Sequence, residues 1–200
     1  MPNVSQAQVD STPAPPESPP ESRVLRLISD RLTQRENPLI LDLGPTFGDN
    51  IRFFADKAKK LFTFDLFTCL DEANRNRLPA KTAFRFLAYP SRYFDGVLLW
   101  NLIDHLNTTD ARELARIIRE ITRPEGVVMI LAQDLFKPRE YPIAFSIRDE
   151  SRFHSQSLTE LQLQAYYRPT REILDLMDSF VLIKSFISRQ GIREYLFLRH

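Results

Sequence analysis

Short apolar runs alternate along the chain with segments whose apolar residues recur at helical spacing. Residues 39–43 form an apolar run of the length of a strand, and a Gly-Pro pair ends it. The next segment places Ile51, Phe54, Ala55 and Ala58 at positions i, i+3, i+4 and i+7, which predicts an amphipathic helix. The same criteria predict seven strands, at residues 39–43, 61–66, 84–88, 94–100, 127–131, 180–188 and 193–198, and helices near residues 22–37, 49–58, 70–77, 110–121 and 170–180.

The order of these elements predicts an α/β domain with a mostly parallel sheet and helices on both faces, because parallel strands need crossover connections. The last two strands are an exception. Only residues 189–192 separate them, which is too short for a crossover, so we expect an antiparallel hairpin. Residues 195–198 are apolar at every position, so the terminal strand is predicted to lie inside the sheet.

Two segments fall outside this pattern. Residues 1–21 contain many prolines and three acidic residues but no Lys or Arg, which predicts a disordered arm followed by a single domain over residues 22–200. The connection at residues 134–169 is much longer than an ordinary loop and is rich in aromatic residues, so it is a candidate lid or substrate loop. Ser157 and Glu160 have the spacing of a capping box, so a short helix at that point is the alternative.

The composition is that of a soluble globular protein and argues against several kinds of partner. The chain has 27 Lys and Arg against 26 Asp and Glu, a net charge of +1 that gives no basic surface for nucleic acid. Cys69 is the single cysteine, so the sequence predicts neither an intrachain disulfide nor a zinc site. No apolar run approaches the roughly 18 residues that span a bilayer, and a signal peptide is lacking. We expect a cytoplasmic protein with no membrane partner; the oligomeric state stays open.

The candidate ligand site lies beyond the carboxyl ends of the first two strands, where open parallel sheets bind their ligands. Asp42 lies near the end of the first strand, and Gly44 and Gly48 follow it; glycine lets the backbone approach a ligand closely. Asp65 ends the second strand 21 residues after Gly44, a spacing that suits a carboxylate accepting from ribose hydroxyls. Each feature alone also occurs in ordinary turns and helix caps, but the combination predicts a nucleoside site.

These residues resemble the class I S-adenosylmethionine-dependent methyltransferases. The first motif of that family is acid-x-Gly-x-Gly-x-Gly. Asp42, Gly44 and Gly48 match it, and Thr46 replaces the middle glycine. Asp65 matches the acidic residue that the family places after its second strand.

Two further segments carry the resemblance, which extends over residues 38–200. Residues 94–99 match the fourth-strand signature, and residues 123–126 (Arg-Pro-Glu-Gly) resemble the Arg-Pro-Gly-Gly turn before the fifth strand. One departure stands out: residues 88–93 contain no acidic residue, where the family often has one near adenine. The resemblance implies a Rossmann-like fold with a seven-stranded, mostly parallel sheet and an antiparallel C-terminal strand.

The resemblance also implies S-adenosyl-L-methionine as cofactor, with a defined set of binding residues. Tyr89 could stack on adenine, and the face of Trp100 could stabilise a sulfonium by cation–π attraction, although core packing explains either ring as well. His105 is a candidate proton acceptor, and the alternative is a polar residue without catalytic duty. The predicted cofactor-binding residues are Asp42, Gly44, Thr46, Gly48, Asp65, Leu66, Tyr89, Trp100 and Asn101.

We therefore predict a methyltransferase that acts on a small-molecule acceptor, a reaction that depends on alignment more than on catalytic side chains. The alternative is a catalytically degenerate methyltransferase-like domain that serves as a binding or interaction module. Thr46 and the missing acidic residue motivate that alternative. An NAD-dependent dehydrogenase is disfavoured, because Thr46 and Asp49 interrupt the Gly-x-Gly-x-x-Gly pattern that it needs.

Overall fold

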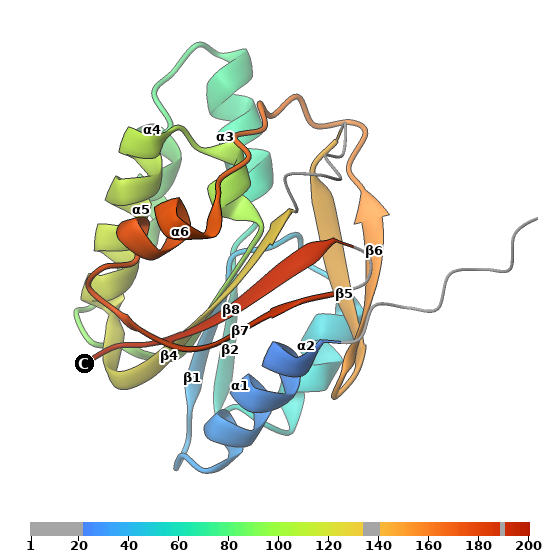
Figure 1. Ribbon diagram of the computed structural model, residues 1–200, viewed down its shortest axis with the longest axis vertical. Coiled ribbons are helices and arrows are strands. Elements are labelled where there is room, and N and C mark those ends of the chain that lie inside the picture. The colour runs from blue at the N-terminus through green and yellow to red at the C-terminus, as the bar shows by residue number, and fades with distance from the viewer. Residues whose placement is uncertain (1–21, 134–140, 189–190) are drawn as a thin grey trace, which may run out of the picture.

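A six-stranded sheet forms the centre of the fold (Figure 1), and a separate two-stranded sheet lies beside it. The computed structural model describes residues 22–133, 141–188 and 191–200. The strands are β1 (Leu39–Asp42), β2 (Lys60–Thr63), β3 (Phe94–Trp100), β4 (Thr122–Gln133), β5 (Ile143–Asp149), β6 (Arg152–Ser157), β7 (Val181–Ile187) and β8 (Ile192–Leu198). The helices are α1 (Arg23–Thr33), α2 (Gly48–Ala55), α3 (Leu66–Arg75), α4 (Lys81–Phe84), α5 (Thr108–Ile121) and α6 (Thr170–Leu176), with 3-10 turns η1 (Arg85–Leu87) and η2 (Leu102–His105).

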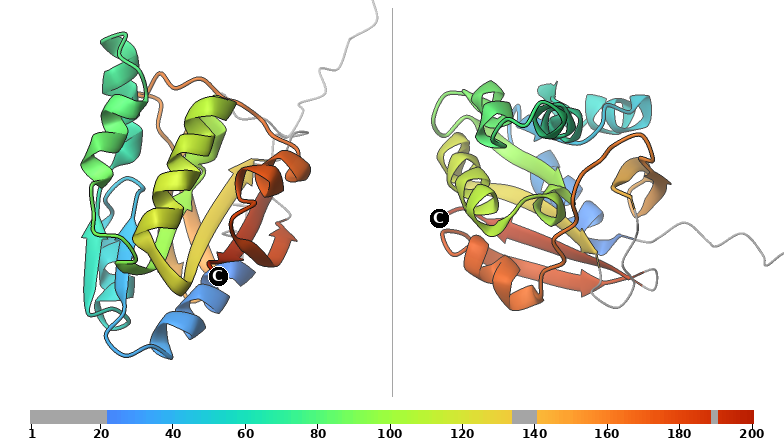
Figure 2. Two further views of the ribbon diagram at one scale, coloured as in Figure 1. Left: turned by 90° about the vertical axis from the view of Figure 1, so that its left-hand side faces the viewer. Right: turned by 90° about the horizontal axis from the view of Figure 1, so that it is seen from above.

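The large sheet has the strand order β2-β1-β3-β4-β8-β7. Its first four strands are parallel, and β8 lies antiparallel between β4 and β7. Helices α5 and α6 cover one face and α1 and α2 the other, as Figures 1 and 2 show. This arrangement confirms the predicted α/β class, the antiparallel terminal hairpin and the interior position of the last strand.

Residues 84–88 were expected to form a strand, and that prediction is wrong. They belong to α4 and η1 instead. Ala83, Phe84 and Leu87 are buried, which is helical spacing, whereas Phe86 is 52% exposed. In a strand, Phe84 and Phe86 would lie on the same face, whereas here Phe84 is buried and Phe86 is exposed. The sheet therefore has six strands rather than seven, and β2 forms its edge.

The long connection after β4 contains a hairpin rather than a helix. Residues 134–140 lie outside the described residues, as does the predicted arm at residues 1–21. Strands β5 and β6 follow, and Ser157 pairs with Ile143 in the hairpin, so the short helix considered at residues 157–160 does not form. The side chain of Asn50 in α2 donates to the Phe145 carbonyl and accepts from the Ile147 amide, which fixes the hairpin on α2.

Side-chain caps set where two of the helices begin. The Ser22 hydroxyl accepts from the Leu25 amide at the start of α1. The Asn107 side chain accepts from the Asp110 amide, so α5 begins at Thr108, two residues before the predicted start at Asp110. The capping residue of α5 is thus Asn107, which lies before the predicted start of the helix.

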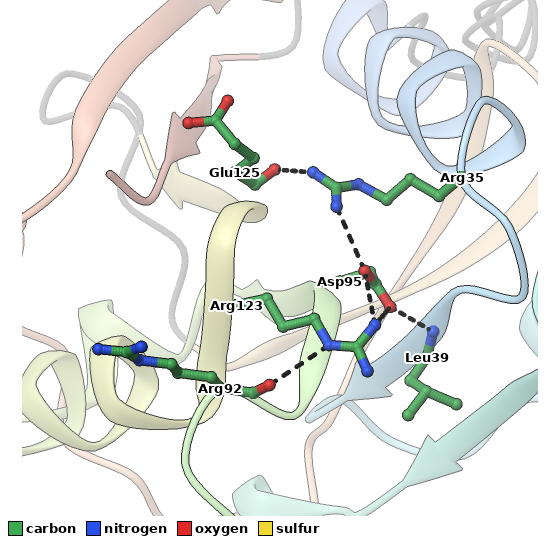
Figure 3. Close-up of polar contacts among 6 residues, drawn as sticks. All are labelled: Arg35, Leu39, Arg92, Asp95, Arg123 and Glu125. Atoms are coloured by element: carbon green, nitrogen blue, oxygen red, sulfur yellow. Dashed lines mark hydrogen bonds and ion pairs between the residues drawn. The ribbon is translucent and has the colours of Figure 1, made fainter.

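The amino-terminal ends of three strands meet at the buried carboxylate of Asp95 (Figure 3). One carboxylate oxygen accepts from the Leu39 amide of β1 at 2.9 Å, and both accept from Arg123 of β4 at 3.0 and 3.2 Å. Arg35 adds a contact of 3.4 Å and also donates to the Glu125 carbonyl. The two segments that resembled family signatures, around Asp95 and Arg123, therefore join each other and stabilise the sheet at the end opposite to the candidate site.

We expect Asp95→Ala to lower the free energy of unfolding by about 2 to 3 kcal/mol, since it leaves the Leu39 amide and two guanidinium groups without their shared acceptor. Urea unfolding followed by circular dichroism measures this. The matched control is Glu113→Ala, which removes an exposed carboxylate paired with Arg116 on α5 and should change stability by no more than about 0.5 kcal/mol. Equal effects of the two substitutions would contradict the role assigned to Asp95.

Candidate cofactor site

The predicted site residues come from adjacent strands that end at one edge of the sheet. Asp42, the last residue of β1, pairs with Thr63 of β2 on one side and with Leu98 of β3 on the other. Asp65 lies two residues beyond Thr63, and Trp100 two residues beyond Leu98. The structure therefore brings Asp42, Asp65 and Trp100 to one end of the sheet, as predicted from the motif order.

The carboxylate of Asp42 is buried and hydrogen bonded by three donors. Its Oδ1 atom accepts from the Gly44 amide at 2.9 Å and from the Trp100 indole Nε1 at 2.5 Å. Its Oδ2 atom lies 3.5 Å from the Asn50 amide nitrogen. Burial raises the pKa of Asp42 to about 6; these hydrogen bonds oppose the rise, and the nearby charge of Asp65 adds slightly to it.

The indole of Trp100 fills the space beside Gly44. A Cβ atom added at Gly44 would lie 2.5 Å from both Cδ1 and Nε1 of the indole, so the ring is in contact with the glycine turn. Trp100 is only 1% exposed and has a φ of 49°, which is unusual for a bulky residue. Phe145 stacks on it with centroids 6.0 Å apart, and Phe153 packs edge-on at 5.8 Å. These two aromatic residues belong to the segment predicted as a lid or substrate loop, and they form a buried aromatic cluster with Trp100.

The other side of the turn is open. Thr46 and Gly48 are exposed, and a Cβ atom at Gly48 would meet nothing within 4 Å. Asp65 is partly exposed and caps α3: its two oxygens accept from the Thr68 amide at 3.0 Å and the Thr68 hydroxyl at 2.8 Å. The Leu66 side chain is fully buried and offers no exposed surface to a ligand.

Tyr89 does not reach the site. Its ring packs edge-on against Phe62 and Phe94, with centroid distances of 5.8 and 4.9 Å. Phe94 begins β3, whereas Trp100 ends it, so Tyr89 lies at the opposite end of that strand. The packing alternative is therefore the one that the structure favours for Tyr89.

His105 is buried and has a partner at each ring nitrogen. Its Nδ1 atom lies 3.3 Å from the Gln164 carbonyl, and its Nε2 atom lies 3.3 Å from the Asn101 amide nitrogen. Burial lowers the pKa of His105 to about 4, so the ring is neutral at pH 7. A neutral imidazole has one donor and one acceptor nitrogen, and both are occupied, which favours the non-catalytic alternative for His105.

A cavity of about 280 Å³ adjoins His105. It lies between α3, the start of α5 and the connection at residues 158–169, with Asn107 and Tyr166 in its wall. In the part of the chain that the structure describes, no group of three His, Cys, Asp or Glu side chains could hold a metal ion. Across the same residues, no helix is long and apolar enough to cross a membrane.

Sequence reasoning missed Asn50, which bonds both Asp42 and the hairpin. The sequence spacing could have identified this residue. Asn50 lies three residues after Phe47 and four before Phe54, which places it on the apolar face of α2. A polar residue on such a face needs hydrogen-bond partners.

The hydrogen-bonding groups of the site suit S-adenosylmethionine, but the space beside Gly44 is filled and does not admit it. Two carboxylates at adjacent strand ends provide acceptors for an ammonium group and for ribose hydroxyls, and the turn at Gly48 is accessible. The Trp100 indole, however, takes both an acceptor position on Asp42 and the surface of Gly44. The residues present therefore fit the cofactor only after the Trp100 side chain has left this position.

The raised pKa of Asp42 predicts a pH dependence of stability. The folded chain keeps the Asp42 proton up to about pH 6, whereas the unfolded chain loses it near the ordinary value of 3.8. Stability attributable to Asp42 should therefore fall as the pH rises from about 4 to about 6, by about 3 kcal/mol in total. Urea titrations of the wild type and Asp42→Asn at several pH values measure this, because the other buried acids whose pKa is raised, Asp104 and Glu194, contribute to both proteins. A difference between the two proteins that stays constant from pH 4 to 7 would contradict the burial of an ionisable Asp42.

Comparisons with known proteins bear on the family and on the fold. A family model described as a methyltransferase domain matches residues 20–179. A search of curated proteins finds no match. Among solved structures, an S-adenosylmethionine-dependent methyltransferase from Mesorhizobium loti is 15% identical with a TM-score of 0.59, covering 88% of this chain and 96% of that one.

Two further solved structures are similar in fold. A 1,6-didemethyltoxoflavin-N1-methyltransferase from Burkholderia thailandensis, with S-adenosylhomocysteine bound, is 15% identical with a TM-score of 0.53, over 89% of this chain and 79% of that one. The cyclase SpnF is 12% identical with a TM-score of 0.52, over 88% and 80%. At such identities the structures show a shared fold only, and the family model is what decides membership. Because that model spans most of the chain, the protein belongs to the methyltransferase domain family, whose enzymes use S-adenosylmethionine as methyl donor.

Proposed function

We propose that this chain transfers a methyl group from S-adenosylmethionine to a small organic acceptor. The observation that carries the proposal is the placement of Asp42 and Asp65 at adjacent strand ends, on either side of the exposed turn that contains Gly48. Packing alone does not require two carboxylates there, one of them buried and raised in pKa.

Each site residue has a definite binding role under this proposal. Asp42 accepts from the cofactor's ammonium group, and Asp65 accepts from ribose hydroxyls while still capping α3. The Oδ1 atom of Asn101, next to Trp100, is buried and has no hydrogen-bond partner among the described residues, so it is a free acceptor beside the site. The cofactor's sulfonium supplies an already activated methyl group, so this chain's residues need to orient the reactants and exclude water.

Size and charge favour a small acceptor. The cavity beside His105 has about 280 Å³, and its wall is formed by neutral polar and apolar side chains together with Asp110. The net charge of +1 provides no field that would attract nucleic acid. The methyltransferase from Burkholderia thailandensis, which shares the fold, holds the small molecule 1,6-didemethyltoxoflavin.

A second candidate function is a binding module without turnover. One observation favours it: Trp100 fills the space beside Gly44 and takes the hydrogen-bond acceptor that a cofactor would use. The fold is compatible with activities other than methyl transfer, because the similar SpnF structure is that of a cyclase.

Calorimetry with S-adenosylhomocysteine tests the proposed site. We expect Asp65→Asn to weaken binding about tenfold or more, because the amide replaces a charged acceptor while it still caps α3. The matched control is Asp149→Asn, which changes a partly exposed carboxylate paired with Arg152 at the turn between β5 and β6 and should leave the affinity unchanged. If both variants bind S-adenosylhomocysteine as tightly as the wild type does, the ligand binds at a different site.

Turnover separates the two candidate functions. We expect the purified chain to convert S-adenosylmethionine to S-adenosylhomocysteine when it is incubated with a mixture of small amines, phenols and thiols. Mass spectrometry should detect an acceptor that is about 14 Da heavier, which is the CH₂ unit that one methyl transfer adds. Absence of S-adenosylhomocysteine binding at millimolar concentration would favour the binding module. Binding of the ligand by the chain would support the cofactor site whether or not the mixture contains its acceptor.

A further inference from the structure

Trp100 occupies the space beside Gly44 and donates a hydrogen bond to the Oδ1 atom of Asp42. We infer that the Trp100 side chain acts as an internal occupant of the cofactor site, and that it must leave Asp42 and Gly44 before S-adenosylmethionine binds. The inference rests on the proposed function, because it concerns access to the same site. It assigns to Trp100 a role opposite to the cation–π contact that the sequence suggested.

The first argument is the hydrogen bond. Asp42 is almost fully buried, and the Trp100 indole donates to its Oδ1 atom at 2.5 Å. A buried carboxylate needs such donors, so the indole N–H fills the need that a ligand's ammonium group would otherwise fill. A ligand that approaches the Oδ1 atom of Asp42 therefore competes with the indole.

The second argument is the space. The indole lies so close to Gly44 that not even a methyl group fits between them, since a Cβ atom there would be 2.5 Å from the ring. Glycine at this position would let a cofactor lie against the backbone, and the chain has placed its own side chain there. On the far side of the turn, Gly48 stays open, so the site is closed at one end only.

The third argument is that contacts with the β5–β6 hairpin stabilise the indole in this position. Phe145 stacks almost parallel on Trp100, at an interplanar angle of 9°. Asn50 joins this cluster to the carboxylate, because its side chain contacts Asp42 and also bonds the backbone at Phe145 and Ile147. The position of the β5–β6 hairpin and the position of the indole are therefore linked through a few contacts.

When a side chain occupies the binding site, only the molecules in which it has moved away can bind ligand. The apparent association constant is then the intrinsic constant multiplied by the fraction of open molecules. Removing the occupant should restore the intrinsic affinity. Trp100 is the only tryptophan of the chain, so its intrinsic fluorescence reports the indole's position directly.

The first experiment measures fluorescence of the wild-type protein with and without S-adenosylhomocysteine. We expect the free protein to show blue-shifted emission that acrylamide barely quenches, because the indole is buried. At saturating S-adenosylhomocysteine the emission should shift to the red, and quenching by acrylamide should rise severalfold. Calorimetrically detected binding with emission and quenching unchanged would overturn the inference and leave the proposed function standing.

The second experiment compares S-adenosylhomocysteine affinity in Trp100→Phe, which removes the indole N–H and reduces the ring, and in the wild type. We expect Trp100→Phe to bind about tenfold tighter or more than the wild type. Tyr89→Phe is the matched aromatic control at the opposite end of β3 and should behave as the wild type. Equal affinities in Trp100→Phe and wild type would overturn the inference alone. No binding by either protein, with both folded by circular dichroism, would overturn the inference and the proposed function together.

Discussion

A buried carboxylate at the end of a strand is stable only if other groups supply its hydrogen bonds, and this constraint organises the ligand-binding end of the molecule. Asp42 obtains its donors from the glycine turn, from α2 and from the end of β3. The donor from β3 is Trp100, and the aromatic cluster with Phe145 then positions the β5–β6 hairpin. The Asp42 carboxylate thus connects the turn, the helix and the insertion.

Much of the fold could be predicted from periodicity, because most elements are buried on a regular face. The short loop at residues 189–192 required an antiparallel hairpin, and the apolar pattern of residues 195–198 placed β8 inside the sheet. Residues 84–88 misled because alternation over so few positions does not distinguish a strand from one helical turn with a single exposed ring, that of Phe86. The hairpin at β5 and β6 was missed for a different reason: its strands are fixed by contacts with Asn50, far away in sequence.

The site shows the same division between what spacing determines and what packing determines. The approach of Asp42 and Asp65 follows from strand order, so the sequence predicted it. The orientation of Trp100 depends on whether its indole finds an acceptor, and that acceptor belongs to β1, 58 residues away. Tyr89 was placed near the cofactor because a strand was expected before it; with that strand absent, its ring packs at the other end of β3. His105 was a candidate proton acceptor on sequence grounds, and only the structure shows that both ring nitrogens already have partners.

The most direct measurement of the central claim is the proton–nitrogen correlation signal of the single indole N–H, recorded for the wild type and for Asp42→Asn. A hydrogen bond to a buried carboxylate predicts a signal shifted downfield from that of free tryptophan, with slow solvent exchange, and Asp42→Asn should move it strongly upfield. An indole signal that exchanges rapidly with water and does not respond to Asp42→Asn would contradict the account.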